Sequence, residues 1–259
     1  MRPGLNGIPA EDQKKDEAAR RSGELVMDLV RRDVRPKSIV TRQAIENGIA
    51  SVAATGGSTN GVLHLLAIAH EFGIPLDIDD FGAVADRTPI VGDMKPGGRY
   101  SASEMYEAGG VGLVMRELLK RDLLHGEAVT VDGRTIAQIA SDVVETPGQQ
   151  VVVPIETPLK ATGGLAILRG TLAPEGCVVK LAGHERLLHR GPARVFDSET
   201  ACYEAVRGQR IKAGDVVVIR YEGPVGGPGM QEMLQVTAAL VGEGLGDSVA
   251  LLTDGRRER

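Results

Sequence analysis

The sequence contains no tryptophan and few aromatic residues of any kind, with four tyrosines and three phenylalanines among 259 residues. Valine, leucine, isoleucine and alanine must therefore fill the core. Hydrophobic residues make up 42% of the chain, which is enough for a normally buried core. The length is sufficient for one large domain or two modest ones.

Cysteine is also scarce. Cys177 and Cys202 lie far apart in the sequence and form no C-x-x-C motif. This pattern favours a reducing, cytoplasmic setting over a disulfide framework. Two thiols also fall short of the ligand set that an iron–sulfur cluster usually needs.

Long apolar runs and blocks of like charge are absent as well. No run of apolar residues approaches the length of a membrane span, and the first residues show no signal-peptide pattern. The formal net charge is −5, and basic residues form only short clusters such as Arg31-Arg32. Nucleic acids and membranes are therefore not expected as partners.

The first part of the chain has the periodicity of helices. Residues 11–32 repeat apolar side chains at helical spacing with charged residues between them, which predicts an amphipathic helix. Thr41 is positioned to cap a second helix. Residues 62–69 are apolar almost all round, which predicts a buried helix. We interpret His64, inside that helix, as a hydrogen-bonded core residue rather than a catalyst.

Three later features indicate turns and helix starts. Asp77, Asp79 and Asp80 resemble a metal cluster at first sight, but a cap at the start of a helix explains them more simply. Residues 101–104 have capping-box spacing. The pair Asp132-Gly133 between short apolar stretches predicts a tight hairpin turn.

A loop of small residues, Ala54 to Asn60, opens into the apolar helix. Two interpretations of its hydroxyl groups stand side by side. Ser58 or Thr59 caps the N-terminus of the helix, or these hydroxyls and the helix N-terminus hold a substrate carboxylate. Ser58, Thr59 and Asn60 are therefore our candidate substrate-binding residues.

The composition of the sequence changes around residues 146–162, a linker-like stretch that contains several prolines. After it, short β-branched runs replace most of the helical periodicity, with one helix expected between Ser198 and Val206. We predict a domain boundary near residue 155, with domains at 1–154 and 155–259. The first is predicted to be α/β, and the second a β-rich barrel or sandwich with few helices.

Residues 221–230 form a glycine-rich loop between an apolar run, 216–219, and a helical segment, 232–240. Its four glycines and two prolines let the backbone turn sharply and approach a ligand closely. No Gly-Lys-Ser/Thr follows, so the loop does not indicate a nucleotide phosphate site. Glu222 is its only charged side chain. It is either a solvated residue of a tight connection or a hard oxygen ligand for Mg²⁺.

Several stretches match one known family, in the same order and over nearly the whole chain. They are Gly4 to Ala10, Thr55 to Asn60, Lys95 to Tyr100, Leu172 to Gly176, Gly191 to Ser198, Tyr221 to Pro224, Gly227 to Met230 and Leu252 to Arg256. Through them the chain resembles the dihydroxy-acid dehydratases and their sugar-acid dehydratase relatives.

The resemblance implies a lyase that removes water from a 2,3-dihydroxy acid and forms an enol, which becomes a 2-oxo acid. It implies an iron–sulfur cluster that binds the departing hydroxyl group, Mg²⁺ at the carboxylate end, and a serine base. Glu222 matches the position at which the family's C-terminal domain supplies a Mg²⁺ ligand. The implied fold is an α/β N-terminal domain joined to a C-terminal β-barrel, usually in a homodimer.

This sequence departs from the family pattern near both ends. The family's three cluster cysteines, and the Asp and carboxylated Lys that bind Mg²⁺, belong to a portion expected to precede Met1. Neither Cys177 nor Cys202 matches a ligand position. After Asp-Gly-Arg the family continues with Phe-Ser-Gly-Ala-Thr, whose serine is the proposed base, whereas this chain reads Arg257-Glu258-Arg259. We therefore expect a portion of a dehydratase with both domains incomplete, its catalytic serine beyond Arg259, and no activity alone.

Within the family, residues 64–69 and 107–110 are more similar to the enzymes of valine and isoleucine biosynthesis than to the sugar-acid enzymes. The expected substrate is accordingly a small dihydroxy acid. A sugar-acid or phosphogluconate dehydratase of the same family is the first alternative. A non-catalytic chain that associates with a partner is the second.

Overall fold

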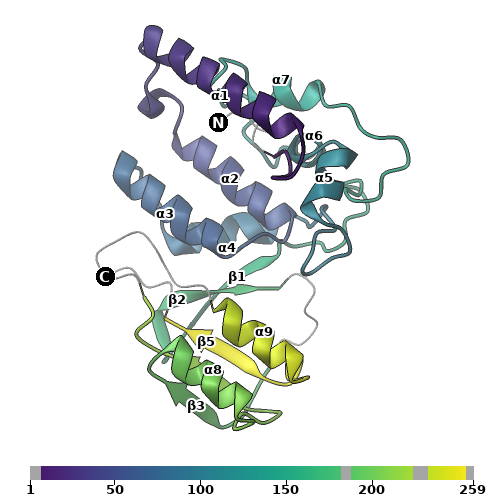
Figure 1. The fold of residues 1–259 in the computed structure, drawn as a ribbon. Helices are drawn as coiled ribbons and strands as arrows, with labels where there is room; N and C mark the ends of the chain where they lie inside the picture. The colour runs from purple at the N-terminus through teal and green to yellow at the C-terminus, as the bar shows by residue number, and fades with distance from the viewer. Residues whose placement is uncertain (1–6, 182–187, 224–232, 255–259) are drawn as a thin grey trace. The chain divides into compact units, whose positions relative to one another are not determined.

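The computed structural model describes residues 7–181, 188–223 and 233–254 of the chain (Figure 1). The chain divides into two compact units, residues 1–185 and residues 186–259. The first is helical with one small sheet, and the second is mixed α/β. None of the helices among the described residues has both the length and the apolar character needed to cross a membrane.

Helices dominate the first unit. Its elements are α1 (Lys14–Arg31), the 3-10 turn η1 (Pro36–Ser38), α2 (Arg42–Ala54), α3 (Asn60–Phe72), α4 (Ile78–Arg87), α5 (Ala102–Ala108), α6 (Val111–Leu119), α7 (Ile136–Ser141), β1 (Leu165–Gly170) and β2 (Ala173–Lys180). The strands β1 and β2 form an antiparallel hairpin that packs against α4. The tight turn predicted at Asp132-Gly133 is confirmed, because the Thr130 N–H donates to the Arg134 carbonyl and Gly133 has a positive φ of 81°.

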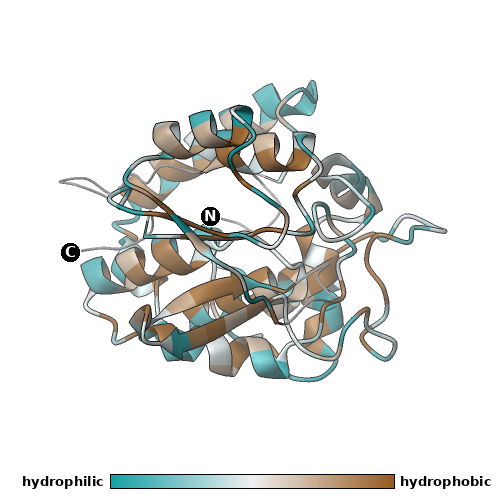
Figure 2. Ribbon diagram, turned by 90° about the horizontal axis from the view of Figure 1, so that it is seen from below, coloured by the Kyte–Doolittle hydropathy of each residue, from teal (hydrophilic) through white to brown (hydrophobic). Residues whose placement is uncertain are grey.

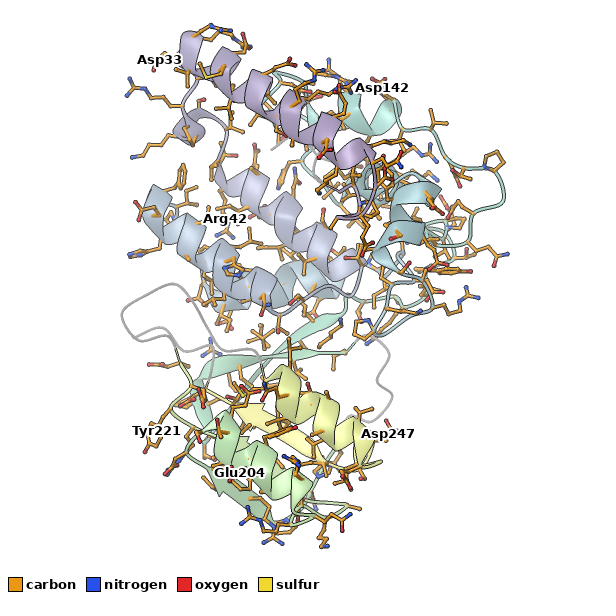
Figure 3. The ribbon with its side chains drawn as sticks, in the orientation of Figure 1. Asp33, Arg42, Asp142, Glu204, Tyr221 and Asp247 are labelled. Atoms are coloured by element: carbon orange, nitrogen blue, oxygen red, sulfur yellow. The ribbon has the colours of Figure 1, made fainter. Side chains whose placement is uncertain are left out.

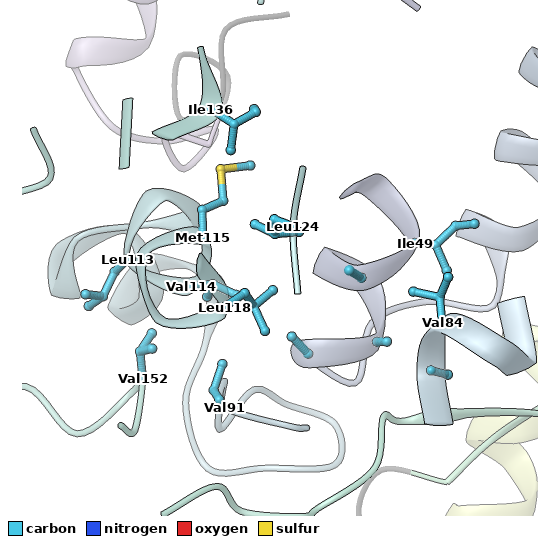
Figure 4. Packing of buried hydrophobic residues seen from close by; sticks show 14 of the residues in the cluster. Ile49, Val84, Val91, Leu113, Val114, Met115, Leu118, Leu124, Ile136 and Val152 are labelled. Carbon is cyan, nitrogen blue, oxygen red and sulfur yellow. The ribbon is translucent and has the colours of Figure 1, made fainter. Parts of the chain in front are cut away.

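Aliphatic side chains fill the core of the first unit, as the composition predicts (Figure 4). Ile49 of α2, Val84 of α4, and Leu113 and Leu118 of α6 are each at most 4% exposed. Burying one such side chain stabilises a fold by about 1.5–3 kcal/mol. Packing of this kind holds α2, α4 and α6 together.

The helices differ in how much of their apolar surface they bury, and hydrophobic and hydrophilic residues alternate around them (Figure 2). The amphipathic helix predicted at residues 11–32 is confirmed as α1, although Val30 on it is 68% exposed. The prediction for α3 was wrong in one respect. Val62 and Ala69 are buried, but His64 is exposed and Ile68 is 42% exposed. His64 is therefore not a core residue, because only part of the apolar surface of α3 packs in this unit.

The acidic trio at the start of α4 forms a capping box. An Asp77 carboxylate oxygen accepts the N–H of Asp79 at 2.9 Å, and Asp80 accepts the N–H of Asp77 at 2.7 Å. Asp79 accepts two hydrogen bonds from Arg169, each at 2.8 Å. The prediction of a helix cap is therefore confirmed.

The second unit alternates strands and helices. Its elements are β3 (Ala193–Phe196), α8 (Glu199–Arg207), β4 (Val216–Ile219), α9 (Leu234–Gly242) and β5 (Ala250–Thr253). The strands pair in parallel in the order β3-β4-β5. A separate core, in which Cys202, Val217 and Val236 are fully buried, joins α8 and α9 to this sheet.

The predicted barrel is not supported. The described residues form a two-stranded antiparallel hairpin and an open three-stranded parallel sheet, and no closed barrel. The physical reason is that helices α8 and α9 connect the β-branched runs, and a helical crossover between neighbouring strands makes them parallel. In coarser terms, the part expected to be α/β is a helical unit with one small hairpin, and the part expected to be β-rich is a mixed α/β unit.

The division between domains at residue 155 stays a prediction. The compact units divide later, between residues 185 and 186. This is because the β1–β2 hairpin belongs to the first unit, where Leu165 is 3% exposed in the core.

Asp80 links α4 to α2 through an ion pair with Arg42, whose position on α2 is labelled in Figure 3. The guanidinium donates to the two Asp80 oxygens at 2.7 and 3.0 Å. These hydrogen bonds, and then that from the Asp77 N–H, hold the pKa of the Asp80 carboxyl below its ordinary value of 3.8. A carboxyl with a lowered pKa adds stability above that ordinary value, and this stability is lost as the pH falls through the folded pKa.

We predict that Asp80→Asn lowers the free energy of unfolding by about 1 kcal/mol at neutral pH, since the pair is partly exposed. The difference from the parent chain should shrink as the pH falls below 3.8 and the carboxyl becomes protonated. Urea unfolding at neutral pH and at a series of acidic pH values measures this. Asp86→Asn on the same helix is the matched control, because Asp86 is exposed and has no hydrogen bond among the described residues. Equal stability of the two variants at neutral pH would contradict the prediction.

Candidate functional site

The carboxyl ends of β3, β4 and β5 meet at one edge of the parallel sheet in the second unit. The ladders pair Phe196 with Ile219 and Ile219 with Thr253, so the three strands end level with one another. In open parallel sheets, ligands bind outside the carboxyl ends of the strands. Glu222 follows β4 at this edge.

The Glu222 carboxylate is held at the start of α8. Its Oε1 accepts the N–H of Glu199, the first residue of that helix, at 2.6 Å. Ser198 Oγ accepts the N–H of Ala201 at 3.1 Å, so two side chains cap this helix. Glu222 is half-buried. A solvated glutamate in a simple turn therefore does not describe it.

Asp254, directly after β5, binds the backbone that carries Glu222. Its Oδ2 accepts the N–H of Tyr221 at 2.9 Å, and its Oδ1 accepts the N–H of Glu222 at 3.1 Å. Tyr221 has a φ of 65°, in the left-handed region. That conformation costs a non-glycine residue roughly 1–2 kcal/mol, so the hydrogen bonds of Asp254 offset local strain.

The helix that Glu222 caps begins with a second acidic residue, Glu199. Glu199 Oε1 is buried and has no hydrogen-bond partner among the described residues. Such an oxygen normally has a donor, a water or an ion next to it. Burial, and then the charge of Glu199, raise the pKa of the Cys202 thiol to about 11. Without a metal ion, Cys202 is therefore a neutral thiol.

The fit of this edge to Mg²⁺ is partial. Glu222 and Glu199 supply hard oxygen donors of the kind that Mg²⁺ prefers. Both oxygens of Asp254 are engaged by backbone N–H groups. Within the described ranges, no group of three or more His, Cys, Asp and Glu side chains could hold a metal ion. Glu222 is thus able to contribute one ligand to a site rather than to form one.

The other candidate residues, Ser58, Thr59 and Asn60, lie together at the start of α3 in the first unit. Ser58 is exposed, and its Oγ accepts the N–H of Asn60 at 3.1 Å. This hydrogen bond closes a turn directly before α3. Thr59 is the N-cap residue by position, but its side chain makes no capping hydrogen bond.

A cavity of about 490 Å³ opens beside this loop. Its lining residues are Thr55, Gly56, Gly57, Ser58, Thr59, Met94, Lys95, Pro96, Met105, Val111, Val114 and Lys180. Apolar side chains thus form much of the wall, next to the hydroxyl groups of the loop and two lysines. The arrangement is able to hold a small acid, with its carboxylate near the lysines and its apolar part against the wall.

Sequence reasoning missed Lys180. It is the last residue of β2, far along the chain from Thr59, and the two meet only because the β1–β2 hairpin folds back onto the helices. Burial lowers the pKa of the Lys180 ammonium group, as expected for a cation partly removed from water. The single local signal was its place at the end of an alternating run, which does not identify a ligand-binding residue.

Known families and proteins match the chain over most of its length. The family models described as dihydroxy-acid/6-phosphogluconate dehydratase N-terminal and C-terminal match residues 1–139 and 150–257. The dihydroxy-acid dehydratases of Koribacter versatilis and Roseiflexus sp. are each 58% identical over 253 residues, or 98% of the chain. That of Nitrosospira multiformis is 53% identical over 256 residues. The matches cover 44%, 45% and 46% of these proteins, so the chain spans about half the length of the curated relatives it matches.

The two hydroxyl groups at the start of α3 are expected to differ in their effect on stability. Ser58→Ala should lower the free energy of unfolding by about 1 kcal/mol, because it removes the acceptor for the Asn60 N–H. Thr59→Val keeps the shape of the side chain and should change it by less than about 0.5 kcal/mol. Urea unfolding measures both variants, because a shift of the midpoint at an unchanged m-value reports a change in stability. A cost for Thr59→Val as large as that for Ser58→Ala would contradict this assignment.

Proposed function

Because the chain belongs to the dihydroxy-acid/6-phosphogluconate dehydratase family, we propose that it is part of a hydro-lyase that converts a 2,3-dihydroxy acid into a 2-oxo acid. The observation that carries this proposal is the 58% identity to proteins named dihydroxy-acid dehydratase over 98% of the chain. The family resemblance associates such enzymes with valine and isoleucine biosynthesis.

In this proposal, the first unit binds the substrate through the loop before α3. Ser58 and Thr59, which line the cavity, and Asn60 beside them orient the acid, and Ser58 also holds the start of α3 through its bond to the Asn60 N–H. Lys180 supplies positive charge at the same cavity. Met94, Met105, Val111 and Val114 line it and suit a short, methyl-bearing chain, whereas a polyhydroxylated sugar acid would leave hydroxyl groups unpaired against them.

Glu222 is proposed as a Mg²⁺ ligand. Support comes from its half-buried carboxylate at the carboxyl edge of the sheet and from the nearby Glu199 Oε1, which has no hydrogen-bond partner in the described part of the chain. A bound Mg²⁺ stabilises the negative charge that develops at the carboxylate end of the substrate. Glu222 would hold one coordination position while the Glu199 N–H keeps its carboxylate oriented.

The whole enzyme is further proposed to carry an iron–sulfur cluster and to act as a homodimer in the cytoplasm. These proposals rest on the family resemblance and on the low cysteine content. Cys177 and Cys202 match no ligand position in the family resemblance, and two thiols are fewer than a cluster usually needs.

A 6-phosphogluconate or sugar-acid dehydratase is the alternative, since the matching family models include that activity in their description. Turnover separates the two. The whole enzyme should form a 2-oxo acid from 2,3-dihydroxyisovalerate and show no turnover of gluconate or 6-phosphogluconate, as measured by detection of the 2-oxo product. Turnover of the sugar acids without the branched acid would refute the branched-chain assignment. Turnover of none of them would favour a non-catalytic partner chain.

The metal proposal predicts the effect of Glu222→Gln in the whole enzyme. An amide is a much weaker ligand than a carboxylate, so the Mg²⁺ concentration for half-maximal activity should rise by about tenfold or more. A titration of activity with Mg²⁺ measures this. Glu204→Gln is the matched control, because the Glu204 side chain is exposed on α8 and makes no hydrogen bond among the described residues. Its position is labelled in Figure 3. An unchanged Mg²⁺ requirement in Glu222→Gln would leave Glu222 as a helix cap alone.

A further inference from the structure

Asp254 is an acidic residue to which the metal proposal assigns no role. Among the described residues, its carboxylate makes no hydrogen bond to the Glu222 side chain. Instead, its two oxygens each accept one backbone N–H, from Tyr221 at 2.9 Å and from Glu222 at 3.1 Å. The backbone of the loop after β4 is thereby tied to the end of β5.

This loop has little other support of its own among the described residues. Tyr221 is in the left-handed region, with φ at 65°, and its side chain is 68% exposed. The Arg220 guanidinium lies 4.9 Å from the centroid of its ring, and Tyr221 itself is labelled in Figure 3. An exposed cation–π contact is weak, and the exposed ion pair between Arg220 and Asp197 contributes little. The two charge-assisted hydrogen bonds that Asp254 accepts are the stronger restraint on the turn.

The conformation of this turn determines where the Glu222 carboxylate lies. Glu222 Oε1 accepts the Glu199 N–H at 2.6 Å, across the sheet edge from its own strand. A side chain reaches that N–H only when its backbone is correctly placed. The contacts therefore form a series from Asp254 to the backbone of Glu222, and from the carboxylate of Glu222 to Glu199.

We propose that Asp254 is a positioning residue for Glu222: by binding the N–H groups of Tyr221 and Glu222, it fixes the direction in which the Glu222 carboxylate points. The consequence for Mg²⁺ rests on the proposed function, whereas the positioning itself does not. A preoriented carboxylate binds a cation with a smaller loss of conformational entropy than a mobile one.

Amide hydrogen exchange in the 259-residue chain tests the positioning directly. Residue-resolved NMR of Asp254→Asn should show exchange at Tyr221 and Glu222 that is about tenfold faster or more. The informative amide is that of Glu199, which Asp254 does not touch. It should also exchange faster, because the carboxylate that binds it is no longer held.

Two comparisons make this result specific. The Ala205 amide inside α8 should keep its parent exchange rate, which indicates that the unit remains folded. Glu204→Gln should leave the exchange rates at Tyr221, Glu222 and Glu199 unchanged, because the charge that it removes makes no hydrogen bond. Faster exchange at Tyr221 and Glu222 with an unchanged Glu199 amide would overturn the proposal, and so would unchanged exchange at all three.

Mg²⁺ titration of the whole enzyme tests the consequence. Asp254→Asn should raise the half-saturating Mg²⁺ concentration, and the double variant Asp254→Asn/Glu222→Gln should match Glu222→Gln alone, because Asp254 acts through Glu222. Additive effects would overturn the consequence. If Glu222→Gln itself left the requirement unchanged, the metal proposal would fail, while the exchange experiment would still decide whether Asp254 positions Glu222.

Discussion

The second unit depends on one constraint, which is that β3, β4 and β5 pair in parallel and end level with one another. Because the strands run in the same direction and end in register, the residues that follow them converge at one edge. Asp254 and Glu222 reach this edge from strands that are more than thirty residues apart in the chain. No local segment could bring these groups together, so the site exists only when the sheet forms.

Backbone N–H groups at that edge need acceptors, and carboxylates supply them. Glu222 serves the start of α8, and Asp254 serves the turn after β4. Asp77 and Asp80 do the same at the start of α4. Carboxylates used in this way are oriented by the backbone they bind. For Glu222, capping a helix and binding a cation are compatible roles, because the capping hydrogen bond engages one oxygen and leaves the other as a ligand.

Neighbouring residues in the loop before α3 have different roles. Ser58 stabilises the first turn of the helix, and Thr59 lines the cavity without a capping bond of its own. Lys180 reaches the same cavity from β2. Partial burial makes its charge more costly, as the lowered pKa shows. A cation held in such a place gains more from an anionic ligand than an exposed one does, because water screens the interaction less.

The sequence by itself determined the features that depend on near neighbours. Helix caps such as those at Asp77 and Ser101, the turn at Asp132-Gly133, the aliphatic core and the family all follow from short stretches of residues. Tertiary structure alone decided the rest. The strands of the second unit form an open parallel sheet rather than a barrel, His64 is exposed, Lys180 lines the same cavity as Thr59, and Asp254 binds the loop of Glu222. The physical reason is that periodicity and capping act within a few residues, whereas the direction of strand pairing and the packing of a hairpin depend on contacts between distant parts of the chain.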